Sequence, residues 1–314
     1  MSVTRDNLRN HGPKWGFRFL QRAQRCPRWF LQGPLMLGIW VAVACMPTQR
    51  RYSREFLSLL HGRRAGWLDV WRHFSAYVEF LLLRLRAAGG EPVASALDPE
   101  NAGEFRTLLS NGEPALFGTF HFGHSDLIGF MLPREKNRRI AMMRLRVANS
   151  EDTEMLERQF GEAVSFIWVN DPDNLLFAIK AAIERGDSLA MQCDRAEYSA
   201  KTEDFHFLGA RRTFPFTIYH LAVLFRRPVI FCFGVPDDAG GTRIIAMPVF
   251  RAQPELRSAE NLQRGRTHFQ TVLERLESLV RQHPHLWFNF LPLNPTAPAP
   301  AKLPATAPVA SGQN

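Results

Sequence analysis

Cysteine is scarce in this chain, and its few cysteines follow no pattern. The four thiols, Cys26, Cys45, Cys193 and Cys232, form no C-x-x-C pair. The spacing therefore predicts neither a disulfide framework nor a cysteine-based zinc site. We expect reduced, apolar cysteines in a protein that faces the cytosol.

The sequence also has no nucleophile-elbow pattern, no expected secretory signal and few tyrosines. No serine or cysteine stands in a G-x-S-x-G pattern, which removes the usual signature of α/β hydrolases. The first apolar segment starts late and has no small-residue cleavage site, so we do not expect it to be a signal peptide. Phenylalanine, at 25 residues against four tyrosines, supplies apolar area without a hydroxyl to satisfy. This excess indicates a large core and would also suit an acyl-binding channel.

Positive charge is what the chain has in excess. The net charge of +9 indicates an anionic partner surface, which charge alone leaves as nucleic acid or anionic lipid. Basic residues are not interleaved with aromatic ones on any one element, and no known nucleic-acid module is present, so nucleic acid is not expected. We expect an anionic membrane surface instead.

An uncharged run near the amino terminus supports that expectation. From Trp29 to Met46 the chain carries no charged side chain, and arginines flank it on both sides. The run is at the lower limit of length for crossing a bilayer, and its symmetrical flanks favour a helix in the membrane interface. A buried core helix is the alternative.

The remaining pattern predicts an α/β fold: a largely parallel mixed sheet flanked by helices, with a helical, membrane-associating N-terminal segment. Apolar spacing predicts a helix over 67–86, on which His73 is expected to be structural, and an amphipathic helix over 258–282. Strands are expected over 114–120, 140–143, 163–169, 188–193 and 228–233, alternating with helices over 172–185 and 214–224. We predict three regions: a helical, membrane-associating region over 1–95, an α/β domain over 96–292, and a disordered Pro/Ala-rich tail over 293–314.

The stretch from His121 to Asp126 carries the clearest chemistry. It follows a predicted buried strand and precedes an apolar run that starts a helix, with Ser125 or Asp126 as its cap. Strand ends of this kind are where open α/β sheets place their chemistry. An imidazole held by a carboxylate keeps one tautomer and can accept a proton from a hydroxyl. The alternative is a structural histidine–aspartate pair.

His121 and Asp126 resemble the H-x4-D motif of the lysophospholipid acyltransferase superfamily. The residues Gly118-Thr119-Phe120-His121-Phe122-Gly123 are similar to the branch that contains the lipid A late acyltransferases. That branch usually continues with Asn and Trp, where this chain has His124 and Ser125, so the acceptor need not be lipid A. The resemblance implies an acyltransferase at the cytoplasmic face of the inner membrane. It would move a fatty acyl chain from an acyl carrier protein or coenzyme A thioester to a hydroxyl of a lipid or glycolipid, with no further cofactor.

The resemblance assigns His121 as general base and Asp126 as the residue that orients it. Asp194 corresponds to an acidic residue that borders the active site in the family, and Arg211 follows an apolar-Gly stretch that shapes the acceptor groove. Arg195 can bind phosphate or pantetheine oxygens, with a structural ion pair as the alternative. For the oxyanion, backbone N–H groups at Gly123 or at the next helix terminus are candidates.

Two further points remain open in the sequence. Arg144 and Arg146 follow a predicted strand and could meet an anionic head group or form a solvated basic face.

His121, His124 and Asp126 are also residue types that bind metal ions, and His206 or His220 could complete such a metal site. The second hypothesis for the function is therefore a metal-dependent hydrolase, although our expectation is a site without metal.

Overall fold

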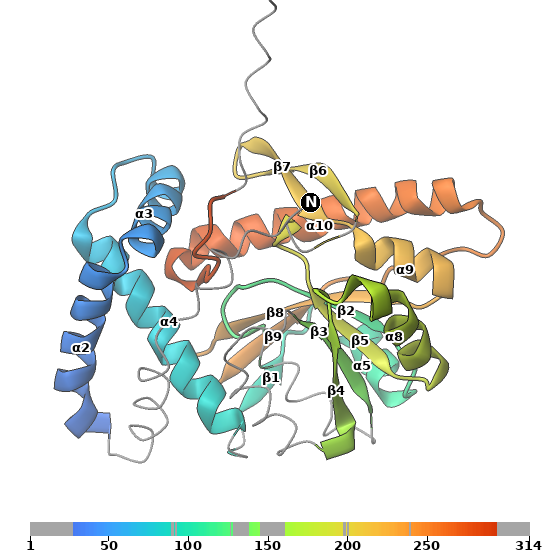
Figure 1. The fold of residues 1–314 in the computed structure, drawn as a ribbon, viewed down its shortest axis with the longest axis horizontal. Helices are drawn as coiled ribbons and strands as arrows, with labels where there is room; N and C mark the ends of the chain where they lie inside the picture. Colours follow the sequence, from blue (N-terminus) through green and yellow to red (C-terminus); the bar gives the residue numbers. More distant parts are fainter. Residues whose placement is uncertain are drawn as a thin grey trace, which may run out of the picture.

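The protein is an α/β structure in the computed structural model, which describes residues 28–88, 91, 93–125, 127, 138–144, 161–196, 199, 201–238 and 240–293. A mostly parallel, seven-stranded mixed sheet forms its centre, in the order β1-β9-β8-β2-β5-β3-β4 (Figure 1). The strands are β1 (Ser95–Leu97), β2 (Leu116–Thr119), β3 (Ile140–Arg144), β4 (Val164–Trp168), β5 (Ser188–Gln192), β8 (Val229–Pro236) and β9 (Thr242–Ala246). The predicted fold class is confirmed at this level.

Strand pairing places the carboxyl ends of most strands at one edge of the sheet. β2 pairs in parallel with β5 on one side and with β8 on the other, and β5 continues to β3 and β4 in parallel. The exceptions are β9, which returns antiparallel to β8, and β1, which pairs in parallel with β9. The residues that follow β2, β5 and β3 therefore lie at the same edge, where sheets of this type place their sites.

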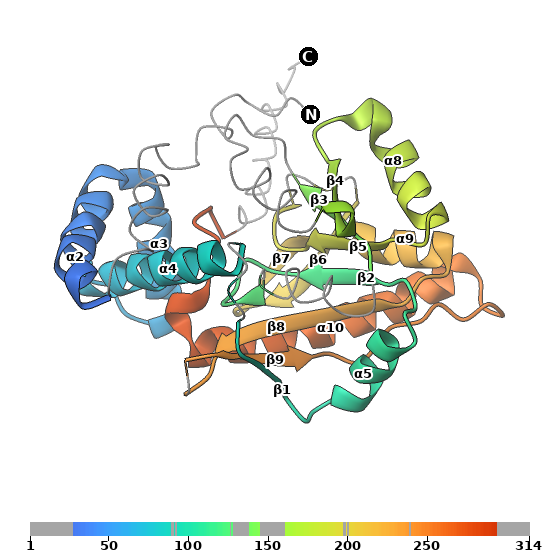
Figure 2. The same cartoon turned by 90° about the horizontal axis from the view of Figure 1, so that it is seen from below.

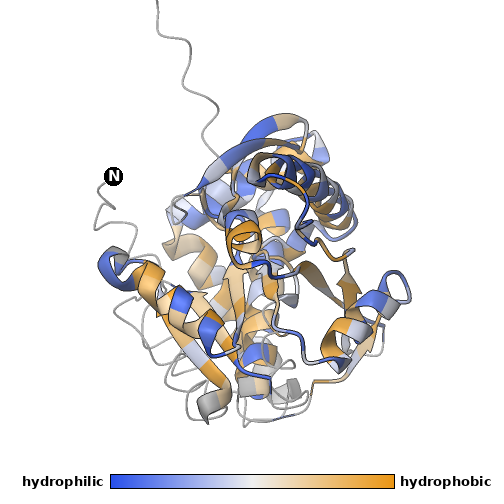
Figure 3. Cartoon of the chain, turned by 90° about the vertical axis from the view of Figure 1, so that its right-hand side faces the viewer, coloured by the Kyte–Doolittle hydropathy of each residue, from blue (hydrophilic) through white to orange (hydrophobic). Residues whose placement is uncertain are grey.

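Helices cover both faces of the sheet (Figure 2). Side chains of α8 (Pro172–Glu184), α9 (Thr217–Phe225) and α10 (Ser258–Gln282) share one core with residues such as Leu116, Phe231 and Leu189. On the other face, Phe105 and Leu108 of α5 (Ala102–Ser110) pack against Phe117 and Ile230. The central strands are mostly hydrophobic, whereas the helices carry hydrophilic residues on their outer sides (Figure 3). Because both faces are covered, β8 is buried along nearly its whole length.

Within the described residues, the strands and helices predicted from apolar runs are present, with one clear error; the helix predicted to start after Asp126 lies largely outside those residues. The helix expected from Phe214 begins only at Thr217, because Ala210–Pro215 is a strand, β7, that pairs antiparallel with β6 (Thr202–Phe207). Leu208 and Gly209 form the two-residue turn between them with φ of 49° and 72°. Two positive φ values are typical of a tight hairpin turn. The apolar-Gly stretch is therefore a hairpin turn and does not lead into a helix.

Three N-terminal helices lie together beside the sheet (Figure 1). They are α2 (Arg28–Cys45), α3 (Pro47–His61) and α4 (Trp67–Ala88), and Ile39 and Val43 of α2 are buried against Val70 and Phe74 of α4. None of the helices in the described part of the chain combines the length and hydropathy that a membrane span requires. The region boundaries stay predictions, and residues 294–314 of the predicted tail lie outside the described residues.

His73 connects these helices to Trp287, in the segment that follows α10. Its Nε2 donates to the Trp287 carbonyl at 2.6 Å, and its Nδ1 accepts from the Ser53 hydroxyl at 2.8 Å. Burial lowers the pKa of His73 to about 3, so the ring is neutral. His73 and Ser53 are both only 1% exposed, so no substrate reaches this serine–histidine pair. The expectation that His73 is structural is confirmed.

Candidate active site

His121 lies just beyond the carboxyl end of β2, where its main chain is held on both sides. Its N–H donates to Asp194 Oδ2 at 2.9 Å, and its carbonyl accepts from the Phe288 N–H at 2.6 Å. The Gly123 N–H donates in turn to the Leu286 carbonyl at 2.7 Å. The end of η5 (Pro284–Leu286) and the segment that follows it thus fix the loop. Fixed main-chain geometry of this kind limits the positions available to the imidazole.

The carboxylate that holds the His121 ring is Asp194. His121 Nδ1 lies 2.8 Å from Asp194 Oδ1 and 3.1 Å from Oδ2. Asp194 follows β5, the strand next to β2, and the Cys193 N–H donates to the Thr119 carbonyl at 2.8 Å. Because the two strands are parallel neighbours, the residues after their carboxyl ends meet.

Burial and charge define the state of this pair. The Asp194 side chain is fully buried, whereas that of His121 keeps 17% of its exposure. Burial opposes ionisation of Asp194, but the charge and hydrogen bonds of His121, together with the charge of Arg195, lower its pKa below the ordinary value. An ionised carboxylate only accepts hydrogen bonds, so Nδ1 carries the proton. In the neutral imidazole, Nε2 is then the nitrogen left to accept a proton.

Asp194, whose side chain is fully buried, also lines a small cavity. The cavity has a volume of about 20 Å³, and its other walls are Phe214, Trp287, Asn289 and residues 291–293. Asn289 Nδ2 donates to the Asp194 carbonyl at 3.4 Å. The carboxylate is therefore shielded from bulk solvent, which strengthens its interaction with the ring.

Gly123 is required by the close approach of two chain segments. Its φ is +52°, and a Cβ atom there would lie 2.2 Å from the Gly234 carbonyl oxygen. The next N–H, of His124, donates to that same oxygen at 2.8 Å. Only glycine fits at this position, which explains the glycine after His121-Phe122.

The expectation that the Gly123 N–H serves as an oxyanion donor is wrong. That N–H donates to Leu286, and those of Phe122, His124 and Ser125 donate to main-chain carbonyls as well. Donors that are already engaged by main-chain carbonyls are not aimed at a developing charge. A donor at the terminus of the predicted helix remains a prediction, since residues 126 and 128–137 lie outside the described residues.

His124 is anchored in the interior. Its Nδ1 lies 2.8 Å from Thr242 Oγ1 and its ring stacks on Phe80 with centroids 6.1 Å apart. Burial lowers its pKa to about 4, so the ring is neutral. Within the described residues no three His, Cys, Asp or Glu side chains gather in a way that would hold a metal ion. His206 is exposed on β6, and His220 lies on α9 against Phe216.

Three of the other predicted site residues, Arg144, Arg195 and Arg211, lie within the described part of the chain. Arg195 follows Asp194, and its Nε is buried with no hydrogen-bond partner among the described residues. Arg144 ends β3, with its guanidinium 5.8 Å from the Phe166 ring centroid. Arg211 is exposed on β7, opposite His206 in the hairpin register. Asp126 and Arg146 lie outside the described residues.

Sequence reasoning found both members of the pair but not their contact. Asp194 was expected to border the site, and the structure gives it the hydrogen bond to the His121 ring that was expected of Asp126. The available signal was that both residues follow predicted strands. The sequence does not show that β5 lies next to β2, because parallel neighbours in a sheet are not adjacent in sequence.

No protein-family model and no curated protein matches this chain.

Proposed function

We propose that the protein is an acyltransferase in which His121 is the general base and Asp194 positions it. It would transfer a fatty acyl chain from an acyl carrier protein or coenzyme A thioester to a hydroxyl of a lipid or glycolipid. The observation that carries the proposal is the hydrogen bond between the buried Asp194 carboxylate and Nδ1 of the partly exposed His121 ring, which leaves Nε2 as the acceptor of the neutral ring. The resemblance of the surrounding sequence to the H-x4-D family supplies the reaction class.

The proposed reaction needs one base and no protein nucleophile. The acceptor hydroxyl gives its proton to His121 Nε2 while its oxygen attacks the thioester carbonyl carbon. The tetrahedral intermediate then expels the thiolate as the carbon–sulfur bond breaks, and the imidazolium returns the proton to sulfur. The products are an ester and a free thiol. Asp194 stabilises the imidazolium without taking its proton.

Charged residues at the same edge fit anionic groups of the two substrates. Arg144 ends β3 and Arg195 lies shortly after β5, and both strands run parallel to β2, with β5 next to β2 and β3 next to β5. Guanidinium groups bind phosphate oxygens in pairs. We assign them to the phosphates of the acyl donor or of the acceptor head group, with Arg146 and Arg211 as further candidates.

Attachment to the cytoplasmic face of the inner membrane is part of the proposal. The outward side of α2 exposes large apolar side chains, including Leu37 at 67% and Val41 at 49%. Exposed groups of this size become stable when they enter a lipid interface. We assign α2 to the interface, because its inner side packs on α4.

The test is acyl transfer by purified, folded His121→Ala with an acyl thioester and membrane lipid extract. General-base catalysis contributes a factor of about 10² to 10⁴, and we expect a loss of that size. His206→Ala, at an exposed histidine of the hairpin, is the matched control and should retain wild-type transfer. Transfer at the wild-type rate by His121→Ala would exclude the proposed mechanism.

A further inference from the structure

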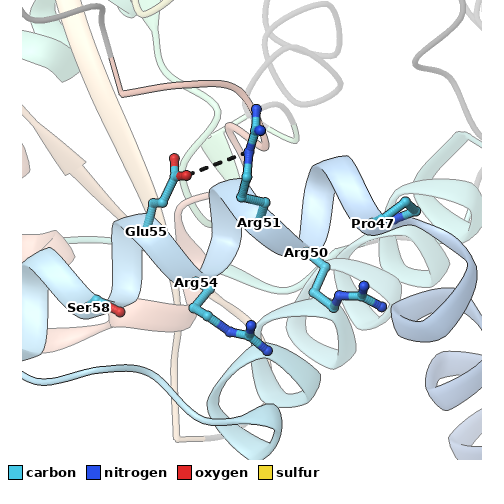
Figure 4. A pocket seen from close by; sticks show the side chains of 6 residues that line it. All are labelled: Pro47, Arg50, Arg51, Arg54, Glu55 and Ser58. Carbon is cyan, nitrogen blue, oxygen red and sulfur yellow. Dashed lines mark ion pairs between the residues drawn. The ribbon is translucent and has the colours of Figure 1, made fainter.

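A shallow depression of about 550 Å³ on α3 is lined mainly by arginine. Its walls are Pro47, Arg50, Arg51, Arg54, Glu55 and Ser58 (Figure 4). Arg50 and Arg54 are four residues apart on a helix and point to the same side, whereas Arg51 points away with Glu55. Two guanidinium groups thus converge on one side of the helix.

Trp67 forms the base under both of these arginines. The guanidinium carbon of Arg50 lies 4.8 Å from the Trp67 ring centroid, and that of Arg54 lies 5.4 Å from it. Arg50 Nη1 also donates to the carbonyls of Val43 and Ala44, at 2.9 and 3.0 Å. These contacts order the side chains before any ligand arrives, which lowers the entropy lost on binding.

We define the groove as Arg50, Arg54 and Trp67. The positive charge of its two arginines is not neutralised by the neighbouring carboxylate, Glu55. Glu55 pairs with Arg51 at 3.6 Å. Within the described residues Arg54 Nε is buried without a hydrogen-bond partner. A planar guanidinium whose charge is not neutralised by a carboxylate favours a tetrahedral oxyanion such as phosphate.

The surroundings of the groove indicate a lipid as the source of that phosphate. Arg50 reaches the last turn of α2, whose outward side exposes Met36, Leu37, Trp40 and Val41. Trp67 itself is 49% exposed, and its neighbour Leu68 is 52% exposed. Apolar side chains beside a basic groove match a bilayer interface, in which head-group phosphates lie beside acyl chains.

We infer that the groove of Arg50, Arg54 and Trp67 binds the phosphate of an anionic phospholipid at a bilayer surface. This inference refines the membrane attachment proposed above and uses none of the residues of the acyl-transfer site. α2 supplies apolar contact with the interface, and the groove supplies selectivity for anionic head groups.

Vesicle flotation with the full-length protein tests this inference without any acyl thioester. One vesicle is phosphatidylcholine alone, and the other is phosphatidylcholine mixed with phosphatidylglycerol. We expect Arg50→Gln/Arg54→Gln to bind the mixed vesicles about thirty-fold more weakly than wild type, from about 1 kcal/mol for each charge at an anionic surface. Binding to phosphatidylcholine alone should be unchanged. Arg54→Gln, which keeps the contacts of Arg50 with α2, should lose about five-fold.

The control is Arg106→Gln/Arg281→Gln, which removes the same charge from exposed positions on α5 and α10. An equal loss in this control would mean that net charge alone drives binding, and it would overturn the inference. Titration with inorganic phosphate provides the second arm. Saturable phosphate binding that depends on Arg50 and Arg54, with unchanged vesicle binding, would assign the groove to a free phosphate compound and would also overturn it. Because no acyl transfer is measured, neither result bears on the role of His121.

Discussion

Replacing Asp194 by asparagine tests how the carboxylate controls the tautomer of His121. The carboxylate accepts two hydrogen bonds from the same residue, the main-chain N–H at 2.9 Å and Nδ1–H at 2.8 Å. An asparagine offers one acceptor oxygen and one NH₂ donor. Its NH₂ therefore takes the place of one carboxylate oxygen and faces the donor that this oxygen accepts at the shorter distance.

Two arrangements of the new amide side chain are possible, and both impair the base. If the amide oxygen faces the main-chain N–H, its NH₂ faces Nδ1, so the ring proton moves to Nε2 and no acceptor is left for the substrate. If the oxygen faces Nδ1–H, two N–H donors oppose each other at a cost of about 1–3 kcal/mol. The imidazolium formed during the reaction also loses a charged partner, worth about 1.5–3 kcal/mol.

Together these effects amount to about 2.5–6 kcal/mol at the transition state. At about 1.4 kcal/mol for each factor of ten, we expect Asp194→Asn to lower the rate by about 10² to 10⁴. The assay is the initial rate of acyl transfer at saturating thioester, with the thermal midpoint measured on the same samples. Asp187→Asn is the matched control, because Asp187 is a buried aspartate just before β5 and is paired with Arg139 and Arg185.

The control should lower stability without lowering the rate of folded protein. A wild-type rate in Asp194→Asn would refute the positioning role of Asp194. If Asp126→Asn removed activity under the same conditions while Asp194→Asn did not, the motif carboxylate would be the one that orients the ring.

Three other predictions concern packing, pH and membrane contact. Gly123→Ala should lower the thermal midpoint and activity much more than Gly112→Ala, because both glycines have positive φ but only at Gly123 would a Cβ meet backbone. The pKa of His124 is about 4 in the folded protein, below its ordinary value of 6.5. The folded protein therefore holds the neutral ring, and the stability that this provides is complete above pH 6.5. As the pH falls toward 4, the unfolded state binds the proton first, and the free energy of unfolding decreases by about 3 kcal/mol. Denaturant titration across that range should show a shallower loss in His124→Gln, and an equal loss would contradict the burial argument. Leu37→Asp/Val41→Asp, at exposed positions, should reduce flotation with neutral vesicles while leaving the thermal midpoint unchanged; undiminished flotation would remove α2 from the interface.

The elements with strong local patterns were predictable from sequence. The helix over Ser258–Gln282 follows the spacing of its apolar residues, and β5 and β8 follow short apolar runs bounded by polar or turn residues. These elements are specified by their own residues, so no knowledge of their neighbours was needed.

The elements that were missed depend on long-range pairing or on turn chemistry. β1 is three residues long and exists because it pairs with β9, far away in the chain. The β6–β7 hairpin depends on Leu208, which adopts a positive φ that apolar residues rarely take. The same limit applied to the site: Asp194 and His121 are neighbours only because β5 lies next to β2.

The central claim is that His121 transfers an acyl chain to a lipid, and lipid mass spectrometry of cells that lack the protein tests it most directly. The account predicts that one lipid class loses one acyl chain in these cells. Re-expression of wild-type protein should restore that chain, and His121→Ala at equal abundance should not. Full restoration by His121→Ala, or an unchanged lipid profile in the absence of the protein, would contradict the account.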